Sequence, residues 1–186
     1  MNINEKQICT GSDCAAKGAE MDKKTWEEVI HQLRRAYCDE WLAYIQYWTA
    51  AQVVNGFTRT AVACELMENA EEELEHARKL SDRIQALCGE IPVSPQEILE
   101  NCNCAFVAPS DPCGYRILCQ SIASERCAIA VYKRILKMLG DRDPVTSRLI
   151  LEILEDEEEH EFEFRQLKED IDASRKALGL DGEMKK

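Results

Sequence analysis

Apolar residues recur at intervals of three and four along long stretches of the chain, and this spacing places them on one face of an α-helix. The first stretch is predicted to begin at Thr25, because Thr25-Trp26-Glu27-Glu28 has the form of a capping box. It ends at Asn55-Gly56, which is a turn signal. Its apolar positions are Val29, Leu33, Ala36, Cys38, Trp41, Tyr44, Ile45 and Trp48.

Start and stop signals predict three more long helices. Proline after an aspartate favours a helix start, and glycine favours a helix end. The predicted helices run from about Thr58 to Cys88, from Asp111-Pro112 to Leu139-Gly140, and from Asp143-Pro144 to Leu178-Gly179.

The connection between the second and third long helices is longer than the other two. Within it, Ser94-Pro95-Gln96-Glu97 reads as a helix cap and predicts a short helix through about Cys102. Tight turns join the helices within each pair. We therefore predict an all-α four-helix bundle with one long crossover containing a short helix. The bundle domain is expected at residues 23–180, after a flexible segment at 1–22 and before a short polar tail at 181–186.

Charge narrows the range of partners. The 186 residues carry 23 Lys+Arg against 35 Asp+Glu, a formal net charge of −12. An acidic chain is poorly suited to DNA or to an anionic membrane and is well suited to cations. No apolar run is long enough to span a membrane and no secretory signal is recognisable, so a cytoplasmic location is expected. Ten cysteines are many for that compartment, which suggests that some thiols serve chemistry.

Two Glu-x-x-His motifs are the strongest chemical signal. Glu73 and His76 lie in the second long helix, and Glu157 and His160 lie in the fourth. Residues three apart are neighbours on one helical face, so each pair can bind one metal ion. Taken alone the motif has low specificity, because the surrounding sequence is rich in glutamate.

An internal repeat makes the motifs specific. Glu40 lies 33 residues before Glu73, and Glu125 lies 32 residues before Glu157. Two helix pairs would thus each supply the same three ligands, which together form the ligand set of a di-iron carboxylate site. The alternative is a solvated bundle with ordinary surface ion pairs. Apolar neighbours of Glu40 and Glu125 argue against it, because an unpaired buried carboxylate costs several kcal/mol.

The segment Ile153-Leu154-Glu155-Asp156-Glu157-Glu158-Glu159-His160 resembles the fourth-helix signature of bacterioferritins. Over residues 25–178 the chain resembles the ferritin-like superfamily, in its bacterioferritin and Dps-like ferroxidase branch. The resemblance implies a cage that oxidises Fe2+ with H2O2 or O2, stores Fe3+ oxide and protects against oxidative stress. It implies two iron ions per subunit, with Mn or Zn as substitutes, held by Glu40, Glu73, His76, Glu125, Glu157 and His160.

Tyr47, seven residues after Glu40, matches the tyrosine beside the metals of bacterioferritins, although a plain core tyrosine would fit as well. Leu74 stands where bacterioferritins carry the haem-ligating methionine, so no haem is expected. The short polar tail favours a Dps-like dodecamer over a 24-subunit cage. Since all six ligands come from one chain, the resemblance narrows to the thioferritins.

Thioferritins are marked by a cysteine pair beside the metal centre. Cys102 and Cys127 resemble this pair and are predicted to be a redox couple, with Cys104 a competitor of Cys102. Two buried apolar cysteines are the alternative. Two other functions stay open. A rubrerythrin-like peroxidase without storage usually carries Cys-x-x-Cys pairs, which this sequence lacks. A Dps-type nucleoid protein would need a basic tail, whereas the charges of residues 1–24 balance.

Overall fold

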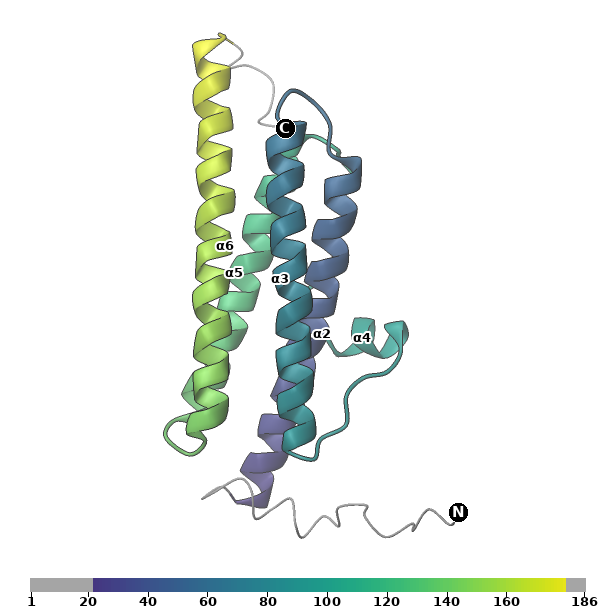
Figure 1. The fold of residues 1–186 in the computed structure, drawn as a ribbon, viewed down its shortest axis with the longest axis vertical. Helices are drawn as coiled ribbons and strands as arrows, with labels where there is room; N and C mark the ends of the chain where they lie inside the picture. The colour runs from purple at the N-terminus through teal and green to yellow at the C-terminus, as the bar shows by residue number, and fades with distance from the viewer. Residues whose placement is uncertain (1–21, 180–186) are drawn as a thin grey trace, which may run out of the picture.

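The computed structural model describes residues 22–179, and five helices lie in this range (Figure 1). Expectations for residues 1–21 and 180–186 lie outside the described residues. The all-α bundle with a helix-bearing crossover is confirmed. Its helices are α2 (Lys23–Val53), α3 (Arg59–Ala86), α4 (Pro95–Asn101), α5 (Gly114–Leu139) and α6 (Pro144–Ala177).

Local capping explains where the helices begin. Helix α2 starts before the predicted Thr25, because Asp22 is the N-cap and its carboxylate accepts hydrogen bonds from Thr25 N at 3.0 Å and Thr25 Oγ1 at 2.7 Å. The capping box predicted there is therefore wrong. Ser94 and Asp143 cap α4 and α6 as predicted, each followed by proline in the first turn.

Helix α5 starts later than predicted, at Gly114. The Asp111 carboxylate accepts a hydrogen bond from Cys113 N at 3.0 Å, and the Pro112 carbonyl accepts one from Asn55 N at 2.9 Å. Residues 111–113 therefore form a turn that pairs with the end of α2 instead of a first helical turn. This contact joins the two helix pairs at one end of the bundle.

Helices α2 and α3 pack as one pair and α5 and α6 as the other, while α4 lies outside the bundle against α2 (Figure 1). The apolar core is divided into two clusters. One contains Leu33, Leu80 and Ile153, and the other contains Leu66, Leu118 and Phe164. Each long helix contributes residues to both clusters, and on each of them buried charged side chains lie between the two sets of apolar residues. No described helix has the length and apolar character needed to cross a membrane.

Candidate metal centre

The six predicted ligands all lie inside the bundle, and each is only 1–2% exposed. Helices α2 and α5 contribute one carboxylate each, and α3 and α6 contribute one Glu-x-x-His motif each. Burial of four carboxylates in one layer is costly without positive partners. The six residues are Glu40, Glu73, His76, Glu125, Glu157 and His160.

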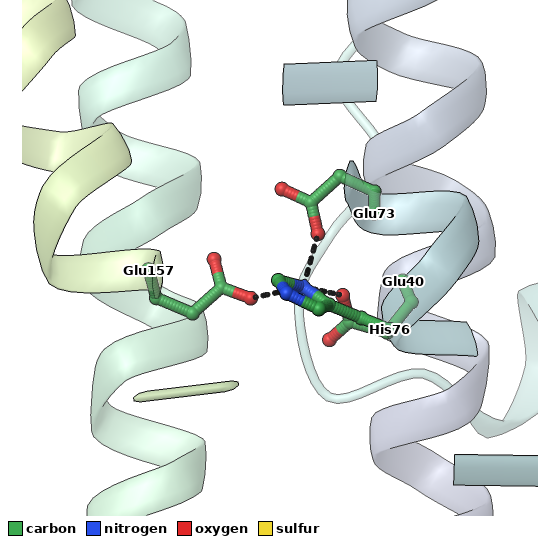
Figure 2. A group of neighbouring side chains, drawn as sticks. All are labelled: Glu40, Glu73, His76 and Glu157. Carbon is green, nitrogen blue, oxygen red and sulfur yellow. Dashed lines mark ion pairs between the residues drawn. The ribbon is translucent and has the colours of Figure 1, made fainter. Parts of the chain in front are cut away.

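These residues form two overlapping groups. In each group, one candidate ligand atom per residue lies within 4.8 Å of the others. One group joins Glu40 and His76 to Glu73 and Glu157, and Figure 2 shows these carboxylates converging on the imidazole from three helices. The other joins Glu125 and His160 to the same two glutamates. Glu73 and Glu157 belong to both groups and would contribute to both metal positions, a distinction that sequence spacing left open.

Individual atoms support this arrangement. Glu73 places Oε2 3.5 Å from His76 Nδ1 and Oε1 3.4 Å from His160 Nδ1. Glu157 places Oε1 3.3 Å from His76 Nδ1 and Oε2 3.8 Å from His160 Nδ1. Each central carboxylate therefore presents one oxygen to each imidazole. Glu40 lies on one side only, with Oε2 3.4 Å from His76 Nδ1.

The inward-facing atoms lack hydrogen-bond partners among the described residues. They include both oxygens of Glu73 and of Glu157, Oε2 of Glu40, and Nδ1 of both histidines. Buried polar atoms left in this state are rare and costly. Carboxylate oxygens and imidazole nitrogens are also suitable ligands for divalent iron, manganese or zinc. The residues present therefore fit a pair of divalent cations.

Outer carboxylates orient the two imidazoles. His76 Nε2 lies 3.1 Å from Asp156 Oδ2, and His160 Nε2 lies 2.9 Å from Glu72 Oε2. With the proton on Nε2 donated outward, Nδ1 is free to bind a cation. Sequence reasoning missed both partners. A signal existed, since each one directly precedes the glutamate of a Glu-x-x-His motif, but each contacts the histidine of the other helix.

Two buried tyrosines contact the outer glutamates of the centre. The Tyr47 hydroxyl donates to Glu125 Oε1, and the Tyr132 hydroxyl donates to Glu40 Oε1. Tyr47 therefore contacts a predicted ligand instead of only filling the core. Tyr132 was missed, although it follows Glu125 by the same seven residues that separate Tyr47 from Glu40.

Burial and neighbouring charges shift the pKa of several groups in the centre toward their protonated forms. Burial, and then the charge of Glu40, raises the pKa of Glu73, and burial with the charge of Glu157 raises the pKa of Glu125 well above its usual value. Burial lowers the pKa of His160, but contacts with Glu73 and Glu157 outweigh this and raise it to about 10. Burial also lowers the pKa of His76, but hydrogen bonds with Glu157 and Glu40 outweigh burial and raise it. A cation would compete with protons for these groups, so its affinity should rise with pH.

The predicted pairing of Cys102 with Cys127 is wrong in one partner. Cys127 on α5 is bonded to Cys104, with a Cα–Cα distance of 6.0 Å, and Cys102 is a free thiol. The Cys102 sulfur instead faces the end of α4, where it donates to the Leu99 carbonyl at 3.3 Å. Cys104 lines a small cavity together with Glu40 and Glu125, so the disulfide adjoins the candidate metal centre.

A helical bundle that gathers four carboxylates and two imidazoles around two adjacent positions defines the ferritin-like di-iron carboxylate class. The sequence model of the ferritin-like domain matches residues 30–174, and the chain belongs to that family.

Two relatives are 33% identical to the chain. One is the solved structure of a dodecameric thioferritin, the bacterioferritin-related protein of Bacteroides fragilis, with a TM-score of 0.83 over 90% of this chain and 98% of that one. The other is the DNA protection during starvation protein of Pyrococcus furiosus, matched over 76% of this chain and 77% of its own length. The bacterioferritin of Desulfovibrio desulfuricans shares the fold, with 23% identity, a TM-score of 0.69, and coverage of 81% of this chain and 83% of that one.

Proposed function

We propose that the protein is a ferroxidase that oxidises Fe2+ with H2O2 or O2 and stores the Fe3+ as oxide in a cage. The observation that carries this proposal is the pair of four-residue groups that share Glu73 and Glu157, whose inward-facing atoms have no hydrogen-bond partner among the described residues. Two Fe2+ ions would balance the charge of the four buried carboxylates. Mn2+ or Zn2+ could occupy the same ligands.

A pair of sites suits a two-electron oxidant. Two Fe2+ ions, one H2O2 and two protons give two Fe3+ ions and two water molecules, so no hydroxyl radical need be released. Glu40 and His76 would hold one Fe2+, Glu125 and His160 the other, and the shared glutamates would hold both in place. Tyr47 and Tyr132 fix the outer glutamates through their hydrogen bonds. The biological role would be iron storage combined with protection against oxidative stress.

The Cys104–Cys127 pair is proposed to be a reserve of reducing equivalents. When two thiols form a disulfide they release two electrons and two protons, which is what one H2O2 needs to become two water molecules. The pair adjoins the cavity that Glu40 and Glu125 line, so both would meet the same oxidant. Resemblance to the thioferritins supports this role.

Anaerobic titration tests the proposal. Reduced protein loaded with Fe2+ should consume one H2O2 per two Fe2+, and the Cys104–Cys127 pair should add one more H2O2 per subunit. A Cys127→Ser variant should lack only the extra equivalent. A Glu73→Ala/His160→Ala variant should oxidise iron no faster than buffer, whereas Glu159→Gln, an exposed change on α6, should match the wild type. Wild-type rates in the double variant would overturn the proposal.

Storage distinguishes this function from a rubrerythrin-like peroxidase. The proposed assembly is a cytoplasmic dodecamer, and similarity to the dodecameric thioferritin of Bacteroides fragilis supports that number of subunits. Electron microscopy of iron-loaded protein should show dense mineral cores inside uniform particles. Iron oxidation without any core would favour the peroxidase.

Protection of DNA is the second candidate, and the Pyrococcus furiosus relative carries that name. The net charge of −12 argues against direct binding to DNA, because such binding relies on neutralisation of phosphates by basic side chains. Protection through removal of Fe2+ and peroxide needs no such contact. We therefore propose the chemical form of protection for this chain.

A further inference from the structure

The crossover between α4 and α5 is irregular, yet polar side chains of α2 hold it at several points. Arg35 donates to the carbonyls of Asn101 and Cys102, both at 3.3 Å. Further along, Gln46 Oε1 accepts a hydrogen bond from Val107 N at 3.0 Å. Between these points lies Asp39, which is only 6% exposed.

The Asp39 carboxylate binds two consecutive residues of the crossover. Its Oδ1 accepts hydrogen bonds from Asn103 N at 2.6 Å and Cys104 N at 2.8 Å, and its Oδ2 accepts one from Asn103 Nδ2 at 2.6 Å. Hydrogen bonds to a charged acceptor are stronger than neutral ones. A buried carboxylate on α2 thus fixes the backbone at the residue whose sulfur is bonded to α5.

The position of Asp39 also links the crossover to the candidate metal centre. Asp39 directly precedes Glu40, and both line the small cavity that Cys104 and Glu125 line as well. The backbone N–H of Cys104 donates to Asp39. Cys102 contacts α2 through its backbone carbonyl, which accepts a hydrogen bond from Arg35. This difference agrees with the observed choice of Cys104 as the partner of Cys127.

We propose that Asp39 is the positioning residue of the Cys104–Cys127 pair, and that it holds the Cys104 backbone so that its sulfur stays within reach of Cys127 when both are thiols. A restrained thiol loses less conformational entropy when the bond forms, so the restraint favours the disulfide over the dithiol. The inference needs only the disulfide and not iron oxidation. Failure of the proposed ferroxidase activity would leave it standing.

The test measures the redox equilibrium of this pair in the full-length, metal-free protein. Protein is equilibrated without oxygen in mixtures of glutathione and its disulfide, where the protein dithiol plus oxidised glutathione gives the protein disulfide plus two glutathiones. After acid quenching and alkylation, trypsin releases Cys127 in a peptide of its own, residues 127–133. Mass spectrometry then gives the oxidised fraction and identifies any mixed disulfide.

Asp39→Ala removes three hydrogen bonds and should lower the equilibrium constant for the disulfide at least about tenfold, which is about 30 mV for this two-electron couple. Asn103→Ala keeps both backbone hydrogen bonds and should shift it less than about threefold. Asp143→Ala is the matched control, because Asp143 is another aspartate that is 6% exposed and caps α6 instead of the crossover. It should leave the constant unchanged although it destabilises the bundle.

Two results would overturn the inference. One is an Asp39→Ala constant within about twofold of the wild type, and the other is an equal shift in Asp143→Ala, which would indicate a general loss of stability. Circular dichroism establishes that each variant is helical. If Asp39→Ala is not helical, Asp39→Asn is tested in its place, because this change keeps the shape of the side chain and still removes its charge. That variant should lower the constant at least about threefold, and an unchanged constant would equally overturn the inference.

Discussion

Glu73 and Glu157 differ from the other carboxylates of the candidate metal centre because each belongs to both groups of ligand atoms. Glu40 and Glu125 belong to one group each and are held by tyrosine hydroxyls. The same residue type therefore has two roles, which depend on where its two oxygens point. Loss of a shared carboxylate should affect two cations, and loss of an outer one should affect one.

A titration of metal-free protein with Zn2+ tests this difference. Glu40→Gln should weaken one of two bound ions and leave the other tight, whereas Glu73→Gln should weaken both. Each affected ion should lose at least about a hundredfold in affinity, since loss of an outer-shell partner alone costs ten- to hundredfold. Isothermal titration calorimetry gives the stoichiometry, with Glu159→Gln as the exposed control. An equal loss of Zn2+ affinity in the two variants would contradict the proposal that Glu73 contributes to both metal positions.

At the scale of elements, one buried cluster joins the end of α3 to the start of α6. Asp143 caps α6 by accepting a hydrogen bond from Thr146 N at 3.0 Å, and it also accepts hydrogen bonds from Arg83 of α3, the shorter at 2.7 Å. Arg83 Nε donates to Thr146 Oγ1 at 2.7 Å as well. The cap therefore stabilises the helix and also fixes the relative position of α3 and α6, which both carry a Glu-x-x-His motif.

Asp143→Ala should lower the free energy of unfolding by about 2 kcal/mol at neutral pH, the upper range for loss of an N-cap. Burial raises the pKa of Asp143, but hydrogen bonds from Thr146 and Arg83 outweigh this and lower it below its ordinary value of 3.8. A lowered pKa stabilises the fold above the unfolded pKa, and this stabilisation is lost as the pH falls. In urea unfolding, the difference in free energy of unfolding between the wild type and Asp143→Ala should be largest near pH 7 and should become smaller below about pH 4. A gap that widens there would contradict this account.

At the scale of the whole molecule, charge and shape act together. A formal net charge of −12 is expected to oppose contact with nucleic acid and to attract cations. The buried carboxylates and imidazoles divide the apolar core into two clusters. Without a bound cation, burial of these charged groups lowers the free energy of unfolding. Bound cations should raise the free energy of unfolding, because a ligand that binds only the folded state stabilises that state.

A gel-shift assay tests the consequence of the charge for DNA. Linear duplex DNA at physiological salt should migrate unchanged in the presence of the assembled protein, because phosphate contacts require clustered basic side chains. Analytical ultracentrifugation of the same sample establishes whether the cage is assembled, with twelve times the chain mass expected. Retardation of DNA by the intact cage would favour the nucleoid-binding alternative.

Local patterns in the sequence determined the bundle and brought the six candidate ligands together. Helical periodicity, the Ser94 and Asp143 caps and the repeated spacing of glutamates and histidines act within single helices or repeat between them. Such signals are short-range, so they can be read without knowledge of how helices pack. Where competing local signals occur, as at Asp22 and Thr25, sequence reasoning chose the wrong cap.

Only the tertiary structure decided which atoms meet across helices. The shared position of Glu73 and Glu157, the contacts of Asp156 with His76 and of Glu72 with His160, and the choice of Cys104 over Cys102 all join distant parts of the chain. They depend on how each helix is rotated about its axis and on the path of an irregular crossover. Periodicity along one helix does not contain that information, because packing of the other helices sets it.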